Sequence, residues 1–330
     1  MRRREFIAGL GSIAAAYPVI ARAQKLAMPA IGYLTVGMGD PFNTTPFNRG
    51  LAEQGYVDGR NVEILYRRVQ QGGDRSQRDA DRSAMAADLV RRRVTVLVGA
   101  TSGTALAAKS ATATIPIVFV SGSDPVELGL VASLSRPGGN VTGTTFLTQE
   151  LTAKRLELLH ELVPGASSIA YLTAPEAAFA GNEIKEAENA ARILGVRLTT
   201  LNATTPTEIE AAFATVSSQR IGAVFMGGSG GFRVQRTQLA ALAARYSVPV
   251  IYPFRENVDA GGLMSYGATI SDAWHLAGTY VGRILKGEKP ADLPVPQSTR
   301  IEMVLNLKIA KALGIEVPTS ILLRADKVIE

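Results

Sequence analysis

The sequence predicts an α/β protein built from two doubly wound, Rossmann-like lobes with a ligand cleft between them. From residue 30 onward, short apolar runs alternate with longer segments of helical period, which is the pattern of parallel βαβ units. A glycine-rich turn at residues 137–140 and one further strand precede a second series of the same kind. The length of 330 residues is also that of about two domains.

The first series predicts five strands and three helices. The run at residues 94–99 is continuously apolar, as in a strand buried on both faces, and the helix before Gly55 stops at a residue suited to a helix end. Strands are expected at residues 30–36, 62–67, 94–99, 117–120 and 141–146, and helices at 47–54, 75–92 and 102–113.

The second series repeats this organisation. Helices are expected at residues 151–162, 182–194, 207–219 and 233–245, with strands at 168–173, 197–202, 223–226 and 249–252. A strand at 263–265, a helix at 271–285 and a strand at 300–306 should cross back between the lobes. The first lobe is therefore predicted at 24–146 plus about 262–292, and the second at 147–261 plus about 293–330.

The two series also resemble each other in sequence. Residues 106–109 and 115–119 are similar to residues 242–245 and 248–252. This similarity favours two lobes of one type facing each other over a single long sheet, and a cleft between lobes is a common place for a small molecule.

The first 23 residues are organised like an export signal peptide. Three arginines at positions 2–4 precede an apolar stretch to Ile20, and Ala21-Arg22-Ala23 has the form of a cleavage site. We expect cleavage after Ala23 and a periplasmic location. Arg3-Arg4-x-Phe6 resembles a twin-arginine signal, and an ordinary Sec leader is the alternative.

Composition excludes several classes of function. The formal charge is +6, and about half of it lies in the leader; the remaining basic residues form no stripe that would bind nucleic acid. The absence of cysteine excludes disulfides, thiolate catalysis and iron–sulfur clusters. No spacing suggests a metal or a nucleotide, so we expect no metal and no cofactor.

Candidate ligand contacts in the first lobe follow two of its strands, because ligands bind beyond the carboxyl ends of strands in open α/β sheets. Thr101 and Ser102 stand at a helix N-terminus, where hydroxyls and backbone N–H groups suit a carboxylate. Ser121, Ser123 and Asp124 follow the next strand. The alternatives are that Ser102 caps its own helix and that Asp124 binds its own backbone.

Candidate contacts in the second lobe occupy the corresponding turns and a later strand. Aromatic side chains near strand ends would supply the apolar half of a pocket. These candidates are Thr173, Gly228, Ser229, Phe254, Glu256 and Tyr266.

The glycine cluster at residues 227–231 also permits an enzymatic interpretation. It matches the G-x-S-x-G turn of serine hydrolases between a strand and a helix, with Ser229 as the nucleophile. The later histidine is His275, which lies inside a predicted helix rather than on a loop, so a catalytic triad is poorly supported. An exported serine hydrolase remains the alternative function.

Several motifs together resemble the ABC-transporter substrate-binding proteins of the tryptophan-binding (TrpX-like) type, which have the type I periplasmic-binding fold. These motifs extend over the whole chain: the Arg-Arg-Arg-Glu-Phe leader, Gly55-Tyr56-Val57-Asp58-Gly59-Arg60-Asn61-Val62, Asp88-Leu89-Val90, Ile115-Pro116-Ile117-Val118-Phe119, Ser123-Asp124-Pro125-Val126, Leu134-Ser135-Arg136-Pro137-Gly138-Gly139-Asn140-Val141-Thr142-Gly143, Lys154-Arg155-Leu156-Glu157-Leu158-Leu159, Gly261-Gly262-Leu263-Met264-Ser265-Tyr266-Gly267 and Arg324-Ala325-Asp326.

The resemblance implies a noncatalytic receptor for an amino-acid-like or aromatic carboxylate, with an ABC permease and an ATPase subunit as partners. It places Thr101, Ser102, Ser123 and Asp124 at the cleft. Where the family often has an acidic or bulky turn, this chain has Gly228-Ser229-Gly230, which implies a ligand without an ammonium group. We expect a monomer that binds a small-molecule solute and no nucleic acid.

Overall fold

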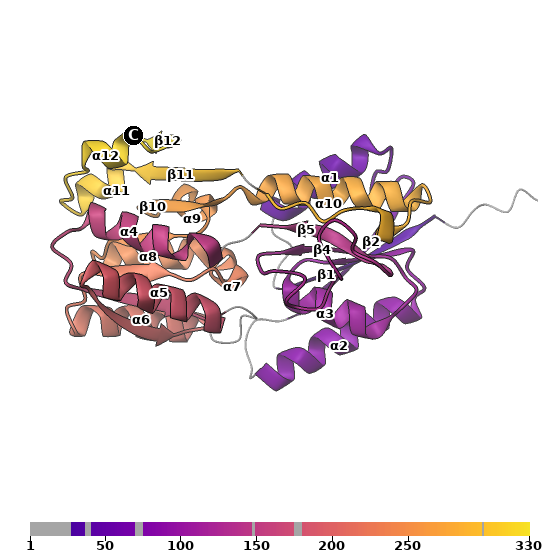
Figure 1. Ribbon diagram of the computed structural model, residues 1–330, viewed down its shortest axis with the longest axis horizontal. Coiled ribbons are helices and arrows are strands. Elements are labelled where there is room, and N and C mark those ends of the chain that lie inside the picture. The colour runs from indigo at the N-terminus through magenta and orange to yellow at the C-terminus, as the bar shows by residue number, and fades with distance from the viewer. Residues whose placement is uncertain (1–27, 37–40, 70–74, 147–148, 175–179, 299) are drawn as a thin grey trace, which may run out of the picture.

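The computed structural model describes residues 28–36, 41–69, 75–146, 149–174, 180–298 and 300–330, so the expected signal peptide lies outside the described residues. The chain forms two lobes that lie side by side along the long axis of the molecule (Figure 1). Each lobe has helices on both faces of a largely parallel sheet. The predicted α/β class with two doubly wound lobes is therefore confirmed.

The first lobe contains five parallel strands in the order β2-β1-β3-β4-β5. In chain order these strands are Ala30–Val36, Glu63–Val69, Val96–Gly99, Ile117–Ser121 and Val141–Thr145. Helices α2 (Arg75–Arg91) and α3 (Ser102–Ala111) cover one face, while α1 (Pro41–Glu53) and α10 (Ile270–Leu285) cover the other (Figure 1). The central strands β3 and β4 are almost entirely apolar because both of their faces are buried, whereas the edge strand β2 carries charged residues.

The second lobe contains seven strands in the order β12-β11-β10-β9-β8-β6-β7, parallel except that β11 runs antiparallel to β10. Strands β6 to β12 are Ser168–Thr173, Arg197–Asn202, Ala223–Met226, Val250–Tyr252, Met264–Ala268, Ile301–Asn306 and Lys327–Ile329. The flanking helices are α4 (Thr152–Leu162), α5 (Ala180–Leu194), α6 (Pro206–Ser218), α7 (Gly230–Val234), α8 (Arg236–Arg245), α9 (Arg255–Asp259), α11 (Leu307–Ala312) and α12 (Thr319–Leu322).

The two sheets share one topology. The order β2-β1-β3-β4-β5 of the first lobe corresponds to β7-β6-β8-β9-β10 in the second. In doubly wound sheets of this order, the strand sequence reverses between the first and third strands, and ligands bind at that switch point. The switch points lie between β1 and β3 in the first lobe and between β6 and β8 in the second.

The chain crosses between the lobes three times. It leaves β5 for a short 3₁₀ turn at Gln149–Leu151 and α4, returns between β10 and α10, and leaves again after the 3₁₀ turn at Pro290–Asp292 to enter β11. The crossing segments are joined by backbone bonds from Ser298 N to Thr145 O (2.7 Å) and from Thr269 N to Arg300 O (2.8 Å). The lobes therefore share a hydrogen-bonded hinge.

Both expected lobe boundaries near this hinge need correction. Strand β10 pairs with β9 and β11, so it belongs to the second lobe although we assigned residues from about 262 to the first. Residues Leu293 and Val295 pack in the cores of the first lobe, although we assigned them to the second. Each of these two crossings lies a few residues later in the chain than predicted, because pairing or packing with the preceding lobe continues up to the crossing.

A few elements also differ from the sequence prediction. The helix expected at residues 233–245 is divided into α7 and α8, which meet at Gln235. Helix α9 occupies the position where a turn was expected at residues 254–256. The elements α11, α12 and β12 were not predicted, because these short pieces pack as a C-terminal addition to the second sheet without a long periodic pattern.

Helix α10 returns to the first lobe and packs closely on α1 (Figure 1). A Cβ atom at Gly50 would lie 1.9 Å from the His275 carbonyl oxygen, and one at Gly278 would lie 2.0 Å from the Phe47 carbonyl oxygen. Glycine at these two positions is what allows the two backbones to approach. Helix α10, although late in the chain, is thereby packed tightly against the first lobe.

Candidate functional site

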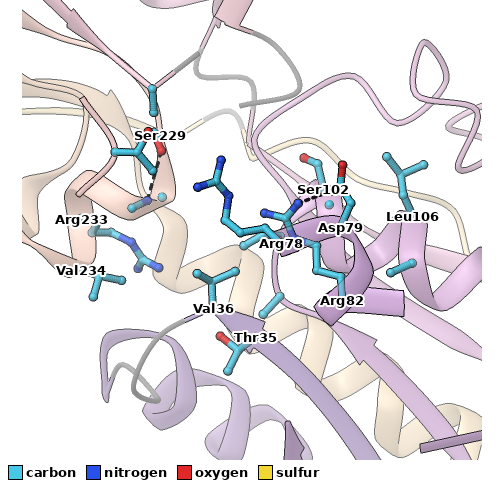
Figure 2. Close-up of a pocket in the computed structure, with 18 of the residues that line it drawn as sticks. Thr35, Val36, Arg78, Asp79, Arg82, Ser102, Leu106, Ser229, Arg233 and Val234 are labelled. Atoms are coloured by element: carbon cyan, nitrogen blue, oxygen red, sulfur yellow. Dashed lines mark hydrogen bonds and ion pairs between the residues drawn. The ribbon is translucent and has the colours of Figure 1, made fainter. Parts of the chain in front are cut away.

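A cavity of about 410 Å³ lies between the lobes, where the two switch points face each other (Figure 2). The first lobe contributes Thr35 and Val36 at the end of β1 and Thr101 and Ser102 after β3, together with one side of α2. The second lobe contributes Ala174 after β6, Thr204 after β7, and the segment from Ser229 to Val234 after β8. This volume is in the range of small-molecule pockets.

The first-lobe wall includes the N-terminus of α3. Thr101 is the N-cap, because its hydroxyl accepts from Thr104 N at 3.2 Å while the Thr104 hydroxyl accepts from Thr101 N at 2.9 Å. The cap that sequence analysis considered for Ser102 therefore belongs to its neighbour. Ser102 occupies the first helical position and is available for another role.

Ser102 belongs to a buried cluster of three hydroxyl groups. Its Oγ lies 2.8 Å from the Oγ of Ser121 and 3.2 Å from the Oγ of Ser123. The Ser121 hydroxyl also accepts from Ser123 N, and the Thr145 hydroxyl donates to Ser121 O. The structure thus brings together three of the predicted residues: Ser102 lines the cavity, and the other two support it from behind.

Asp124 serves the turn after β4 rather than the cavity. Its Oδ1 accepts from Val126 N at 2.7 Å and from Glu127 N at 3.3 Å, and it is not among the residues lining the pocket. The alternative interpretation of this residue, a turn aspartate that binds its own backbone, is the one that the structure shows.

The second-lobe wall includes the turn Gly227–Gly231, which follows β8 and lines the cavity through Ser229, Gly230 and Gly231. The Gly228 N–H donates to both carboxylate oxygens of Glu183, at 3.1 and 3.0 Å. The Ser229 hydroxyl accepts from Gly231 N at 3.2 Å, which makes Ser229 the N-cap of α7, and Ser229 lines the cavity. This part of the wall therefore presents mostly backbone.

A buried ion pair lies beneath this turn. Arg155 of α4 and Glu183 of α5 have 0% and 1% of their side chains exposed, and Arg155 Nη2 lies 2.8 Å from Glu183 Oε1. The Arg155 guanidinium also lies over the Phe225 ring, 5.4 Å from its centroid. Burial, and then the Glu183 carboxylate, raise the pKa of the nearby Tyr171 phenol, so Tyr171 is neutral.

Three arginines reach the cavity from the two lobes. Arg78 and Arg82 come from α2, and Figure 2 shows Arg78 extending across the cavity toward Ser229. Arg82 binds Asp79 with 2.5 Å between Nη1 and Oδ1. Arg233 of α7 donates to Asn43 Oδ1 of the first lobe at 2.6 Å. Guanidinium groups suit carboxylate ligands, because their planar donors match the two carboxylate oxygens.

Comparison with known proteins shows the family. The model of the family described as ABC transporter substrate binding protein matches residues 43–329. The chain belongs to this family. Its resemblance to tryptophan-binding-type members, inferred above from motifs along the sequence, is thereby confirmed.

Individual relatives of this substrate-binding protein agree with the assignment. A tyrosine-binding protein of Clostridioides difficile (strain R20291) is 26% identical over 271 residues, which are 82% of this chain and 76% of that protein. The crystal structure of an ABC domain in complex with L-Trp from Streptococcus pneumonia has a TM-score of 0.78 and 27% identity, covering 91% of this chain and 99% of that chain.

A conserved domain protein from Vibrio cholerae has a TM-score of 0.80 and 27% identity, with the same coverage of 91% and 99%. More distant solute-binding proteins share the two-lobed architecture. The substrate-binding protein thus has the type I periplasmic-binding fold, as expected.

The hydrolase alternative does not hold for this substrate-binding protein, because its family consists of binding proteins rather than enzymes. The proposed partners are also apart in the fold. His275 lies on α10, where its Nε2 is 2.8 Å from Glu53 of α1, while the Ser229 hydroxyl caps α7. A G-x-S-x-G sequence here forms a pocket wall and not a nucleophile turn.

The remaining predicted residues of the binding protein do not line the cavity. Thr173 is buried at the end of β6, and its neighbour Ala174 reaches the wall instead. Phe254 is buried at the start of α9, where it contacts Phe146 and the Arg233 guanidinium. Glu256 is buried in α9, and Tyr266 packs against the core of the second lobe.

Sequence reasoning missed the arginines and the ion pair, although a signal was present. Arg155 lies one helical turn from both Leu151 and Leu159, on the apolar face of its helix, and Glu183 precedes Ala187 on the apolar face of the next one. Two opposite charges on the buried faces of neighbouring helices predict an ion pair. Arg78 likewise continues the buried stripe of α2.

The described residues contain neither a metal-binding cluster nor a membrane-spanning helix. They contain no group of three or more histidine, cysteine, aspartate or glutamate side chains arranged to hold a metal ion. Within the same part of the chain, no helix combines the length and apolar character needed to cross a membrane.

Proposed function

We propose that this protein is the periplasmic receptor of an ABC importer, which captures a small carboxylate between its lobes and delivers it to permease and ATPase subunits. The family supports the transporter role, and the leader sequence supports export. The observation that carries the ligand assignment is the cavity, where a helix N-terminus, a serine hydroxyl and arginines of both lobes converge.

The polar part of this cavity suits a carboxylate. The N-terminus of α3 offers backbone N–H groups and positive dipole, and Ser102 adds a hydroxyl that is fixed by its bond to Ser121. Arg78 and Arg82 lie on the adjacent helix. A charged hydrogen bond from any of these groups is stronger than one between neutral partners.

The apolar part accommodates the body of the ligand. Val36 and Leu106 from the first lobe and Phe232 from the second also line the cavity. We therefore propose an amino-acid-like or aromatic carboxylate. The relatives that are named for tyrosine or were solved with L-Trp support this class of compound.

Contacts across the cleft support binding by closure of the lobes. Besides the bond from Arg233 to Asn43, the Arg236 guanidinium of α8 lies 4.8 Å from the centroid of the Phe42 ring in α1. Both contacts join α1 to the α7–α8 segment at the rim of the cavity. Closure would bury the ligand and form the surface that the importer recognises.

The test is a ligand screen on the exported chain by thermal shift and calorimetry. The panel contains L-tryptophan, L-tyrosine, 3-phenylpropanoate and propanoate. A ligand at about 100 times its dissociation constant stabilises the folded state by about 2.7 kcal/mol, which gives a clear shift in melting temperature. Binding of at least one panel member is expected. A chain that no carboxylate stabilises would contradict the carboxylate proposal.

We further propose that the receptor acts as a monomer and without a metal or cofactor. Size-exclusion chromatography with light scattering on the chelator-treated protein checks both points. The expected result is one species near 34.9 kDa or somewhat less after loss of the leader, with ligand binding unchanged. A dimer, or binding that needs added metal, would contradict this proposal.

A further inference from the structure

We propose that Glu183, held by Arg155, is a specificity-determining positioning residue of the receptor: it fixes the Gly228 amide and so sets the shape of the second-lobe wall. The inference rests on the proposed function only in taking the cavity as the ligand site. Neither residue lines that cavity. Their effect on the ligand would pass through the turn Gly227–Gly231.

On the side of α5, the turn Gly227–Gly231 is held by hydrogen bonds of its own backbone to Glu183. Both oxygens of Glu183 accept from the Gly228 N–H, and the next residue, Ser229, lines the cavity. The glycines have no side chains with which to pack, so the position of the backbone depends on such bonds. A bond at Gly228 therefore determines where the wall stands.

The adjacent residue, Gly227, shows how closely the turn is fitted to the sheet. A Cβ atom there would lie 3.2 Å from the Leu172 carbonyl oxygen and 3.2 Å from the Tyr171 ring and hydroxyl. A side chain at this position would fit only if the turn or its neighbours shifted by a few tenths of an ångström. The turn is thus held against β6 on one side and pulled toward α5 by Glu183 on the other.

The energetics favour a positioning role over a purely stabilising one. Two fully buried charges lose their hydration, and replacing such a pair with apolar residues is often neutral or stabilising. The pair is located under the glycine-rich part of the second-lobe wall. A carboxylate with two acceptor oxygens can hold an amide that no apolar side chain could hold.

The decisive experiment compares two double variants that both remove the charges. Arg155→Met with Glu183→Gln keeps a side-chain oxygen for the Gly228 amide, whereas Arg155→Met with Glu183→Leu does not. Hydrogen exchange of the segment 227–231 is measured by mass spectrometry without ligand. The Leu variant should exchange about fivefold faster or more there, corresponding to one lost hydrogen bond, and the Gln variant should stay close to wild type.

Affinity is the second measurement, with 3-phenylpropanoate and propanoate as probes. In the Leu variant the larger probe should lose about fivefold or more in affinity relative to the Gln variant, with a smaller change for propanoate. Equal exchange and equal probe selectivity in the two folded variants would overturn the positioning role. If wild type binds neither probe, the affinity comparison uses a panel member that it does bind. If it binds no panel member, the carboxylate proposal fails, while the exchange comparison still decides whether Glu183 holds the turn.

If the double variants do not fold, Gly227→Ala tests the same idea with the ion pair intact. The added methyl carbon would lie 3.2 Å from the Leu172 carbonyl oxygen and from Tyr171, so the turn or the Tyr171 side chain must shift by a few tenths of an ångström. Loss of 3-phenylpropanoate binding in a folded Gly227→Ala protein, with retained secondary structure, is expected. Wild-type affinity and selectivity in that variant would show that the position of the turn does not govern the ligand and would overturn the proposal.

Discussion

The two walls of the cavity are built in opposite ways. In the first lobe, side-chain hydroxyls stand at the surface and are braced by neutral hydrogen bonds among Ser102, Ser121 and Ser123. In the glycine turn of the second lobe, backbone stands at the surface and is held from below by the charges of Arg155 and Glu183. The same topological position can therefore be supported by neutral hydrogen bonds or by a buried ion pair. Substitutions in the two supports should lower the free energy of unfolding by different amounts.

The largest difference should appear when one charge is removed from the second-lobe support. Arg155→Met leaves Glu183 buried without its cation, which should lower the free energy of unfolding by about 3–5 kcal/mol. Lys154→Met is the matched control, because Lys154 pairs with Glu157 at the exposed surface and should lose less than about 1 kcal/mol. Urea unfolding of both variants measures the difference, and equal losses would show that the buried pair contributes no more than an exposed one.

Removing one hydroxyl from the first-lobe support should have a smaller effect. Ser121→Ala takes a partner from Ser102 Oγ and from Ser123 N, both buried, so we expect a loss of about 1–3 kcal/mol. Ser110→Ala on α3, at an exposed serine that also borders the cavity, should stay within about 0.5 kcal/mol of wild type. Denaturant midpoints check both values, and a Ser121 variant as stable as the Ser110 variant would argue against a braced cluster.

Helix caps of the two lobes offer a still finer comparison. Thr101 and Thr205 each form a capping box, at α3 and α6, so their replacement by alanine should cost a similar amount of about 1 kcal/mol. Thr101 lines the cavity and Thr205 does not. Calorimetry should therefore find weaker carboxylate binding in Thr101→Ala alone. Equal affinities in the two variants would limit Thr101 to capping.

The sequence predicted the sheets well because most strands are short local runs, and several of them, such as β3, β4 and β8, are largely apolar and buried. Strands β1, β6, β7 and β8 have the residues expected for them, and the similarity of the two series corresponds to one shared strand order. The lobe boundaries were placed too early, because strand pairing at the hinge joins segments far apart in the chain, such as Thr269 and Arg300.

The site was predicted less completely than the sheets, because some of its residues reach the cavity only through the way the two lobes meet. Thr101, Ser102 and Ser229 follow strands directly, so the strand-end rule placed them at the cavity wall that the structure shows. Arg233 follows a strand less directly, and Arg78 lies on a helix whose start faces the cleft. Which helix end reaches the cleft depends on how the lobes meet, and that is a property of the tertiary structure alone.

Glu208 of α6 adds a pH-dependent test beside the second-lobe wall, because its carboxylate accepts from the N–H of Thr204, which lines the cavity. Backbone N–H groups of Thr205 and Thr204 hold the pKa of the Glu208 carboxyl below its usual range. A lowered folded-state pKa means that the carboxylate stabilises the fold at neutral pH, and that this contribution is lost as the pH falls through the folded-state pKa. Glu208→Gln should therefore cost about 0.5 kcal/mol at pH 7 and nothing once wild-type Glu208 is protonated, which urea unfolding at a series of pH values measures.

The smallest expected effect is electrostatic and acts across the cleft. The positive charge of Arg78, on α2 of the first lobe, also lowers the pKa of Glu208, on α6 of the second, although less than the backbone bonds do. Arg78→Gln should raise this pKa slightly in an NMR titration of the Glu208 carboxyl carbon, and the shift should be reduced at high salt, which screens exposed charges. Arg82→Gln is the control, because its charge is balanced by Asp79 and Glu208 shows no influence from it. An unchanged Glu208 pKa in Arg78→Gln would mean that the two walls do not sense each other's charge, and that only a bound ligand couples them.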